Sequence, residues 1–516
     1  MAVPPEPFAT ATADASGVVE SIDPASGVVH ARFAATNPAD IPAIFDRARI
    51  AQKEWAARPL QERCAMVQRL RDTIFDSREE IASVITRETG KPCVEAIFAE
   101  IVLAIDTADF LARRAPRWLR PERVPHHNFA LKAKSGWLEF EPLGVVAIIS
   151  PWNYPFAIPM AQIIPALLAG NAVLLKPSEL TPSTGALIGD LIGKLTGELK
   201  FPPNLVQVIQ GAGETGAALI EVLPDKVFFT GSVATGQRIA EACGRKLIPS
   251  VLELGGKDAM IVLGDADLDI ASSAAVWGSF TNCGQACLSV ERIYVDCAVA
   301  ERFTALCVQK TAKLRLGPPS DADAEVGPMI RLRQLEKVEE HLREAVSRGA
   351  RILFGGHRRL DLGPNFLEPA VIANVDHSMK IMREETFGPV LAIQAGQRRR
   401  ELLRHLRSPS RGPRGQRLGT LALATRTHRN GSDEIRGRRP VAARRQGLVV
   451  RLHVRACLCR RSLRRFSFCA RLAASRFGAH ITARSAKAYL PTGPDLTGSF
   501  RGPRPKKLRQ RCPFHA

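Results

Sequence analysis

Apolar residues at helical spacing mark the first regular structure in the chain. From Asp40 onward they recur every three or four positions, at Ile41, Phe45, Ala48, Ala51 and Trp55. This repeat places apolar side chains on one face of a helix, and Pro42 suits a first helical turn. Similar spacing predicts two more helices, over Leu60–Phe75 and Val94–Arg113.

A second pattern starts at Gly144, where short apolar strands alternate with helical stretches. The predicted strands are Val145–Ile149, Ala172–Leu175, Leu205–Ile209 and Val227–Phe229. This alternation is typical of a parallel, Rossmann-like sheet with crossover helices. A second such region runs from Val251 to about Ile393. The predicted fold class is therefore α/β, with two sheet domains.

Ligand sites of parallel sheets lie at the carboxyl ends of the strands. Four positions of interest follow predicted strands in this way: Asn153, Lys176, Gly211 and Gly231. Ahead of the sheet, residues 131–141 alternate apolar and polar side chains, which predicts a projecting hairpin arm at about 128–141.

These patterns divide the chain into four parts. Residues 1–32 are rich in Pro, Ala, Ser and Gly and are expected to form a loosely ordered lead-in. Residues 33–252 form the first predicted domain, including the arm, and residues 253–393 form the second. Residues 394–516 are rich in Arg and are expected to be disordered.

The positive charge of the chain is confined to its last part. Residues 398–516 hold 28 Arg and 3 Lys against 4 acidic residues, a net of +27, while the whole chain carries +21. The preceding residues therefore carry a net charge of −6. A nucleic-acid-binding function would depend entirely on the basic segment, which has few aromatic residues and no binding module that we can identify.

Cysteine usage and the N-terminal sequence favour a cytoplasmic location. Seven of the 11 cysteines precede residue 394, without the regular spacing of a disulfide framework. The first residues lack the basic and apolar regions of a signal peptide. No apolar run reaches the length of about 18 residues that a membrane span needs.

Candidate chemistry begins with Cys287, in the polar segment Phe-Thr-Asn-Cys-Gly-Gln-Ala-Cys at 280–287. A free cysteine is usually a small buried hydrophobe. A reactive cysteine needs partial exposure and an electropositive setting, such as a helix start, that lowers its pKa below about 8.5. We expect the residues after Cys287 to supply that setting. Cys283 has no histidine cluster beside it, so no metal site is predicted.

Two further residues accompany the cysteine. Glu253 opens Glu-Leu-Gly-Gly-Lys after an apolar run, where an ordinary Glu would be a solvated strand end. Asn153 follows Pro151 and Trp152 after a predicted buried strand, where an ordinary Asn would form a turn. A thiol and a carboxylate together supply a nucleophile and a base that can deprotonate water.

These segments resemble the NAD(P)-dependent aldehyde dehydrogenase superfamily over roughly residues 33–393. The resemblance implies an NAD-binding domain, a catalytic domain and an oligomerisation arm. It implies oxidation of an aldehyde to a carboxylic acid through a thioester on Cys287. Asn153 would stabilise the oxyanion, and Glu253, a partly buried carboxylate of raised pKa, would activate water.

The sequence contains two candidate phosphate loops. Gly211–Gly216 fits G-x-G-x-x-G after a predicted strand, which is a weak match on its own. The family instead uses the next loop, here Gly231–Gly236, and either loop could hold phosphate at a helix N-terminus. The resemblance assigns Ser232 and Gly236 to phosphate and Gly211 to the adenosine.

The remaining cofactor residues are implied by the resemblance. In Lys176-Pro-Ser178-Glu179, otherwise a charged turn, Lys176 and Glu179 would contact the adenosine ribose, and Glu179 would favour NAD while leaving NADP possible. Glu385 would bind the nicotinamide ribose, with Phe387 beside the ring. The other expected cofactor residues are Ser150, Pro151, Trp152, Ser178, Thr230, Gly231 and Leu254.

The family pattern stops between about Gln394 and Arg398. Missing motifs and the Arg bias resemble translation in a shifted reading frame, and a real basic appendage is the alternative. Loss of the terminal strand makes the family oligomer doubtful and predicts a chain that is poorly soluble or inactive. Sequencing the gene would decide between the two.

Two enzyme-level questions stay open in the sequence. A CoA-acylating semialdehyde dehydrogenase would share the thioester, although Glu253 argues for hydrolysis instead. Trp152, Phe156 and Leu288 favour an apolar or aromatic aldehyde over one that carries a carboxylate.

Overall fold

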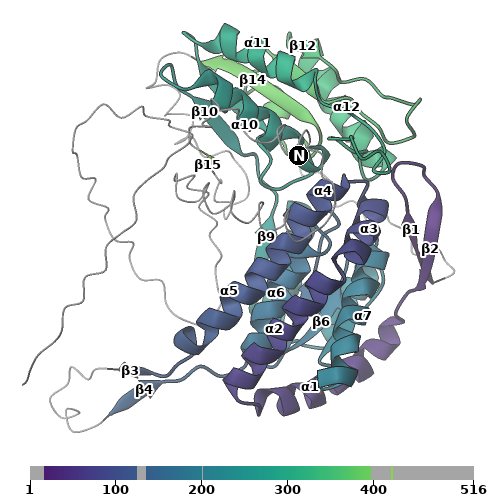
Figure 1. Ribbon diagram of the computed structural model, residues 1–516, viewed down its shortest axis with the longest axis vertical. Helices are drawn as coiled ribbons and strands as arrows, with labels where there is room; N and C mark the ends of the chain where they lie inside the picture. The colour runs from purple at the N-terminus through teal and green to yellow at the C-terminus, as the bar shows by residue number, and fades with distance from the viewer. Residues whose placement is uncertain (1–16, 125–134, 200, 397–419, 422–516) are drawn as a thin grey trace, which may run out of the picture. The chain divides into compact units, whose positions relative to one another are not determined.

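The computed structural model describes residues 17–124, 135–199, 201–396 and 420–421. Its helices and strands follow a βα order around two separate, mainly parallel sheets (Figure 1). Among the helices in these ranges, none combines the length and apolar character needed to cross a membrane.

The first sheet has five parallel strands in the order β7-β6-β5-β8-β9. Their bounds are β5 Val145–Ile149, β6 Ala172–Lys176, β7 Val206–Val208, β8 Lys226–Gly231 and β9 Ser250–Leu254. The predicted strands are confirmed to within a few residues. The order reverses between β5 and β8, and this switch point is where doubly wound sheets bind ligands.

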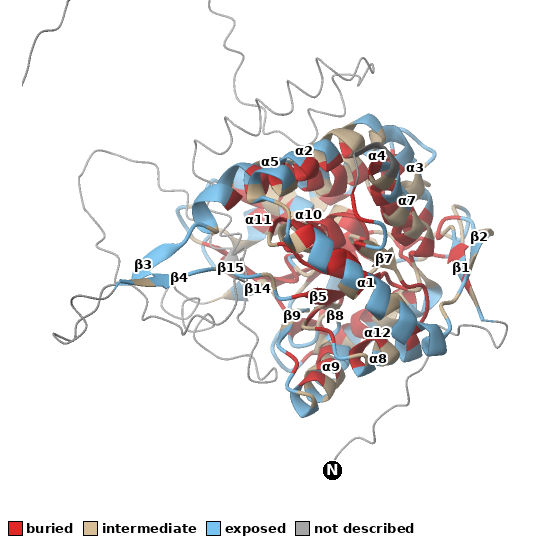
Figure 2. Ribbon diagram, turned by 90° about the horizontal axis from the view of Figure 1, so that it is seen from below, coloured by how far each residue is buried: buried red, intermediate tan, exposed pale blue. Residues whose placement is uncertain are grey.

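Helices cover both faces of this sheet. They are α1 Ile41–Ala56, α2 Leu60–Asp76, α3 Arg78–Thr89, α4 Cys93–Ala96, η2 Ile97–Ile101, α5 Val102–Trp118, α6 Ala157–Leu168, α7 Pro182–Leu199, α8 Gly213–Glu221 and α9 Val233–Arg245. The apolar faces of α1, α2 and α5 meet the buried strands in one core (Figure 2). Helix α3 was not predicted, although its capping Gly90 at φ 75° ends it.

The core contains Trp55 with no exposed surface. Its ring stacks on Phe201 with centroids 5.1 Å apart, and its indole N–H donates to the carbonyl oxygen of Leu167 at 2.7 Å. The predicted apolar stripe of α1 therefore lies against the sheet domain.

The second sheet has the order β12-β13-β14-β11-β10-β15 and is parallel except for β12. Its strands are β10 Ala259–Val262, β11 Arg292–Asp296, β12 Arg351–Phe354, β13 Ala370–Ala373, β14 Val390–Gly396 and β15 Thr420–Leu421. The associated helices are α10 Leu268–Phe280, η4 Thr281–Gly284, α11 Ala300–Thr311, α12 Leu332–Ser347 and η5 Lys380–Met382. The crossing between sheets falls after Leu254, so the predicted boundary at 252 is two residues early.

The prediction of a loosely ordered lead-in was wrong for residues 17–32. Strands β1 Val18–Ile22 and β2 Val29–Ala34 form an antiparallel hairpin, followed by the short helix η1 Pro38–Asp40. The turn is stabilised by the Asp23 carboxylate, which accepts from the N–H of Ala25 at 2.9 Å. Residues 1–16 lie outside the described residues.

Glu88 explains why this hairpin is held in place. Its buried carboxylate accepts from the hydroxyls of Ser21 at 2.5 Å and Thr184 at 2.6 Å, and from the N–H groups of Ser183 and Thr184. One side chain therefore joins β1, α3 and the start of α7. Burial raises the pKa of Glu88.

The hairpin arm is described at its base only. Strand β3 Glu122–Val124 pairs antiparallel with β4 Gly136–Leu138, and residues 125–134 between them lie outside the described residues. The first strand of the pair begins before the predicted range. In the Arg-rich segment, β14 extends to Gly396 and β15 pairs with β10, so the expected disorder was wrong for 394–396 and 420–421. The remainder of that segment lies outside the described residues.

Candidate active site

Asn153 and the Cys287 segment meet at the carboxyl end of β5. The Asn153 side chain is buried, and its Nδ2 donates to the carbonyl oxygen of Gln285 at 3.1 Å. Gln285 is held in turn because its Oε1 accepts from the N–H of Ile330 at 2.9 Å. The structure therefore brings together two segments that are far apart in the sequence.

The backbone before Cys287 is left-handed at three successive residues. Asn282 and Cys283 have φ 54°, and Gly284 has φ 70°. A Cβ on Gly284 would lie 2.2 Å from the carbonyl oxygen of Gly388, so only glycine fits there. Strained backbone of this kind persists where its surroundings hold it. The turn reverses the chain after α10 and presents Cys287 at the surface of the site.

Three buried charged residues that contact the Asn153 and Cys287 loops were not predicted from the sequence. Lys91 and Glu100 form an ion pair with no exposed side-chain surface, and Lys91 Nζ also donates to the carbonyl oxygen of Asn153 at 2.8 Å. The Glu100 carboxylate accepts from the N–H of Phe156 at 2.8 Å. Glu95 accepts from the N–H of Asn282 at 3.0 Å. The available signal was the presence of two acidic residues, Glu95 and Glu100, in a stretch predicted as helical, with Lys91 just before it.

Glu100 lies in η2, a π-helical turn between α4 and α5. Such turns are rare and are frequently found at functional sites. Here the turn places the Glu100 carboxylate under the start of α6. The loop that carries Asn153 is therefore fixed from below by buried charges.

The environment of Cys287 differs from the expectation. Burial, and then the charges of Glu385, Asp258 and Glu253, raise the pKa of the Cys287 thiol to about 11. The predicted lowering of this pKa was wrong because burial raises it most and three nearby carboxylates raise it further. No helix follows Cys287 either, since the chain passes through a turn and enters β11.

This electrostatic setting predicts how the thiol reacts. Alkylation of Cys287 by iodoacetamide should accelerate about tenfold per pH unit up to pH ~11, because the thiolate is the nucleophile. Glu385→Gln removes the largest charge effect, lowers the pKa of Cys287 and should speed alkylation at pH 8. Peptide mass spectrometry of the Cys287 peptide measures the rate.

Glu384→Gln is the matched control because Glu384 is the exposed neighbour of Glu385. Burial raises the pKa of Glu385 to about 7, so the two variants should diverge above that pH, where Glu385 is charged. Equal alkylation rates in the parent and Glu385→Gln at pH 8 would contradict the proposed effect.

Glu253 lies at the end of β9, opposite Thr230 of β8. Its side chain is exposed, so the expected partial burial was wrong; β9 is the edge strand of the sheet and leaves this carboxylate open to solvent. Its charge still acts on Cys287. An exposed carboxylate near the thiol is accessible to water.

Glu385 and Phe387 lie next to the Glu-Leu-Gly-Gly segment. The N–H of Gly256 donates to Glu385 Oε1 at 3.2 Å, and a Cβ on Gly255 would lie 2.1 Å from Glu385 Oε2. Phe387, at φ 55°, packs edge-to-face on Trp152 with ring centroids 5.4 Å apart. Residues predicted from three separate motifs therefore share one site.

The predicted dinucleotide residues border the carboxyl edge of the first sheet. Ser232 caps α9 by accepting from the N–H of Thr235 at 3.3 Å, and Gly236 lies in the first turn of that helix. Gly211 precedes α8, so both candidate loops end at a helix start. The hydroxyl of Ser150 is buried and has no hydrogen-bond partner among the described residues. A buried donor of this kind and a capped helix N-terminus fit a phosphate-bearing ligand.

Lys176 ends β6 with its side chain almost fully buried. Its Nζ donates to the carbonyl oxygen of Pro177 at 2.9 Å and lies 3.6 Å from the Glu179 carboxylate. Burial lowers the pKa of Lys176, and Glu179 opposes that change. Ser178 accepts from the N–H of Leu180 at 3.2 Å. The predicted Lys-Pro-Ser-Glu segment is thus a turn held by hydrogen bonds and an ion pair between its own residues.

A doubly wound sheet beside a second sheet that carries a cysteine loop is the architecture of a two-domain α/β oxidoreductase. Residues 11–408 match the model of the aldehyde dehydrogenase family. The chain therefore belongs to the aldehyde dehydrogenase family. The match extends beyond the predicted range of 33–393 at both ends.

The comparisons also identify individual similar proteins. The chain is 42% identical over 375 residues to "4,4'-diapolycopene aldehyde oxidase" of Methylomonas sp, covering 73% of this chain and 69% of that protein. It is 42% identical over 355 residues to "Putative succinate-semialdehyde dehydrogenase, NADP(+)" of Mycolicibacterium smegmatis, covering 69% and 67%. An aldehyde dehydrogenase structure from Brucella melitensis biovar abortus 2308 superposes with a TM-score of 0.71 at 31% identity, covering 75% and 78%.

These matches confirm the predicted fold and activity class. The chain is an oxidoreductase that converts an aldehyde to a carboxylic acid with NAD(P).

Proposed function

We propose that Cys287, Asn153 and Glu253 carry the reaction in sequence. The Cys287 thiol releases its proton to solvent and its sulfur bonds to the aldehyde carbon. The C=O π bond opens, and Asn153 Nδ2 donates to the oxygen that takes up the negative charge. NAD(P), when bound, supplies the acceptor for the hydride that leaves this carbon. Glu253 then takes a proton from water, whose oxygen attacks the resulting thioester and releases the acid and the thiol.

The observation that carries this proposal is the contact between the Asn153 amide and the Cys287 segment. Nδ2 of Asn153 reaches the carbonyl oxygen of Gln285, two residues before the thiol, at 3.1 Å. An amide donor fixed next to a thiol suits acyl chemistry. The Lys91–Glu100 pair holds the peptide of Asn153 from the other side.

We propose the following cofactor contacts. Ser232 and Gly236 bind the pyrophosphate, Gly211 and Lys176 lie along the adenosine half, and Glu385 and Phe387 lie along the nicotinamide half. The buried Ser150 hydroxyl and the hydrogen-bonded turn at Lys176 support this placement. Pro151, Trp152, Ser178, Thr230, Gly231 and Leu254 line the path between these groups.

We propose that NAD is preferred to NADP because the Glu179 carboxylate repels a 2′-phosphate. Glu179→Gln should raise kcat/KM for NADP by roughly tenfold, the effect of removing about 1.4 kcal/mol of repulsion. The variant should change kcat/KM for NAD much less. Steady-state rates with each dinucleotide measure the ratio.

Glu80→Gln is the matched control, since Glu80 is an exposed carboxylate that also pairs loosely with a lysine, Lys194, at 3.8 Å. If Glu179→Gln and the control had the same ratio of kcat/KM for NADP to kcat/KM for NAD, Glu179 would not determine the cofactor preference.

We propose an apolar aldehyde as the substrate. Trp277 and Leu288, which flank the Cys287 loop, are exposed by 58% and 72%, while Phe156 is completely buried in the core. Phe156 is therefore too deeply buried to contact the aldehyde, and Trp277 and Leu288 are the apolar side chains available to it. The Methylomonas relative is named for 4,4'-diapolycopene aldehyde, and the Mycolicibacterium relative for succinate semialdehyde.

An aldehyde panel with the full chain tests the proposed function. Medium-chain and aromatic aldehydes should be oxidised with a higher kcat/KM than succinate semialdehyde, and free acid should form without CoA. A strict requirement for CoA would establish the acylating alternative. Preference for succinate semialdehyde would overturn the substrate proposal.

We propose further that the Arg-rich sequence after Gly396 arises from a shifted reading frame. The support is compositional: 28 Arg stand against 4 acidic residues from Arg398 onward. Sequencing the gene tests this, and an intact frame with no single-base change that restores the family motifs would refute it.

A further inference from the structure

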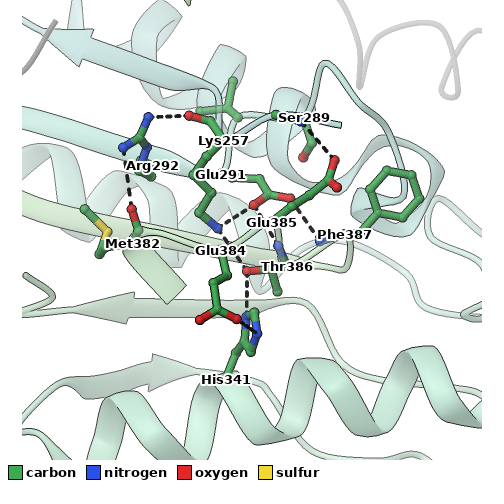
Figure 3. Close-up of polar contacts among 12 residues, drawn as sticks. Lys257, Ser289, Glu291, Arg292, His341, Met382, Glu384, Glu385, Thr386 and Phe387 are labelled. Atoms are coloured by element: carbon green, nitrogen blue, oxygen red, sulfur yellow. Dashed lines mark hydrogen bonds and ion pairs between the residues drawn. The ribbon is translucent and has the colours of Figure 1, made fainter. Parts of the chain in front are cut away.

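Lys257 and Glu291 form an ion pair whose side chains are exposed by only 4% and 5% (Figure 3). Lys257 follows Glu253 by four positions, and Glu291 follows Cys287 by four. The pair therefore joins the segments that carry the proposed base and nucleophile. Buried ion pairs are weak evidence for stability because desolvation offsets their attraction.

Glu291 also holds a third segment through its backbone. Its Oε2 accepts from the N–H of Thr386 at 2.9 Å, and its Oε1 accepts from the N–H of Phe387 at 2.9 Å. Lys257 Nζ donates to the Thr386 hydroxyl at 3.0 Å. Glu291 thus holds the backbone at Thr386 and Phe387, while Lys257 holds the Thr386 side chain.

Neighbouring contacts keep this pair in position. The Arg292 guanidinium donates to the carbonyl oxygen of Lys257 and, at 3.5 Å, to that of Met382. His341 Nδ1 lies 3.2 Å from the Thr386 hydroxyl (Figure 3). The Thr386 segment is therefore enclosed by polar groups from α12, β11 and the loop before β10.

The segment fixed in this way presents Glu385 and Phe387 to the site. Glu385 meets the N–H of Gly256 at 3.2 Å, and Phe387 packs on Trp152 while its backbone stays at φ 55°. Such a backbone conformation is unfavourable for a bulky residue unless other contacts impose it. The Glu291 carboxylate supplies such a contact at the Phe387 N–H itself.

We propose that Lys257 and Glu291 are positioning residues that hold Glu385 and Phe387 against the nicotinamide half of the dinucleotide. The proposal rests on the cofactor placement given above. The pair sets the affinity for the nicotinamide half and leaves the adenosine half, which lies along the first sheet, unaffected.

Binding measurements on the full chain test this, with NADH as the whole ligand and AMP as the adenosine half. Glu291→Gln should raise the Kd of NADH by about tenfold or more, as expected for losing hydrogen bonds to a charged acceptor. The Kd of AMP should stay unchanged. Thr386→Val, which keeps the ion pair, should have a smaller effect, and Glu384→Gln should have none.

A combined Lys257→Met, Glu291→Leu variant separates positioning from stability. Apolar replacements of a buried pair are often neutral for folding, so the Tm should hold while NADH affinity still falls. Parent-like NADH affinity in this variant and in Glu291→Gln would overturn the proposal. A parallel loss of NADH affinity, AMP affinity and Tm would also overturn it, since that pattern reports a structural role.

If the proposed placement of the nicotinamide half is wrong, the binding data will differ from those expected if only the positioning role is wrong. A parent chain that binds AMP but not NADH would refute the assignment of Glu385 and Phe387 to the nicotinamide half. Amide hydrogen exchange without dinucleotide then tests the positioning directly. Glu291→Gln should lose protection in the peptide that carries Thr386 and Phe387, and unchanged protection there would refute the role of the pair.

Discussion

Replacing Cys287 with serine is expected to abolish aldehyde oxidation while leaving dinucleotide binding intact. A hydroxyl is a far weaker nucleophile than a thiolate. Among the described residues, no side chain is hydrogen-bonded to position 287 so that it could deprotonate the serine hydroxyl. Loss of a nucleophile typically costs roughly 10,000-fold or more in kcat. Dinucleotide reduction with an apolar aldehyde measures the rate, and NADH fluorescence measures binding.

Cys283→Ser is the matched control for this experiment. Cys283 lies four positions earlier in the same loop but is buried, with its sulfur 3.6 Å from that of Met329. Burial raises the pKa of its thiol far above the usual range. The control should lower stability and keep activity. If Cys287→Ser retained activity comparable with this control, a thioester on Cys287 would be excluded.

The sequence predicted the first sheet well because its strands are short runs of apolar residues between turn signals. Strand β5 was predicted with the bounds that the structure has, and β6 differs by one residue. Positions at the carboxyl ends of parallel strands meet at one edge, so Asn153 and Lys176 could be placed near each other without a structure. Local pattern and general topology were sufficient there.

The buried charges were beyond the reach of such patterns. Lys91 and Glu100 are partners because a π-helical turn rotates Glu100 inward, and the sequence gives no direct sign of that turn. Lys257 and Glu291 pair across two segments of the second sheet domain. Each of these side chains would be read locally as a solvated charge. Only the three-dimensional arrangement identifies their partners.

The predicted pKa of Cys287 failed for a related reason. A polar loop with glycine favours exposed backbone N–H groups, which would lower the pKa of a thiol. Burial raises it most, and the carboxylates that raise it further, Glu385, Asp258 and Glu253, come from two other segments of the chain. Their combined effect depends on folding. With a pKa of about 11, the thiol form of Cys287 predominates near pH 7.

Glu253→Gln should separate the two halves of the reaction. The amide has nearly the same shape as the carboxylate but cannot accept a proton from water, so thioester formation should proceed and hydrolysis should not. We expect a rapid burst of reduced dinucleotide followed by turnover slowed by roughly 100- to 10,000-fold, the range for losing a general base. Stopped-flow absorbance resolves the two phases.

Glu301→Gln, at an exposed glutamate in the first turn of α11, is the control and should behave like the parent. The exposure of Glu253 on edge strand β9 makes the test informative, because removing its charge leaves no buried group unpaired. If the variant lost both the burst and the steady-state turnover, Glu253 would be needed for the attack of the thiol on the aldehyde. Normal turnover would show that Glu253 takes no part in the chemistry. Hydrolysis of the thioester would then need another base near Cys287. Glu385 and Asp258, whose pKa values are raised to about 7, are two carboxylates that could serve.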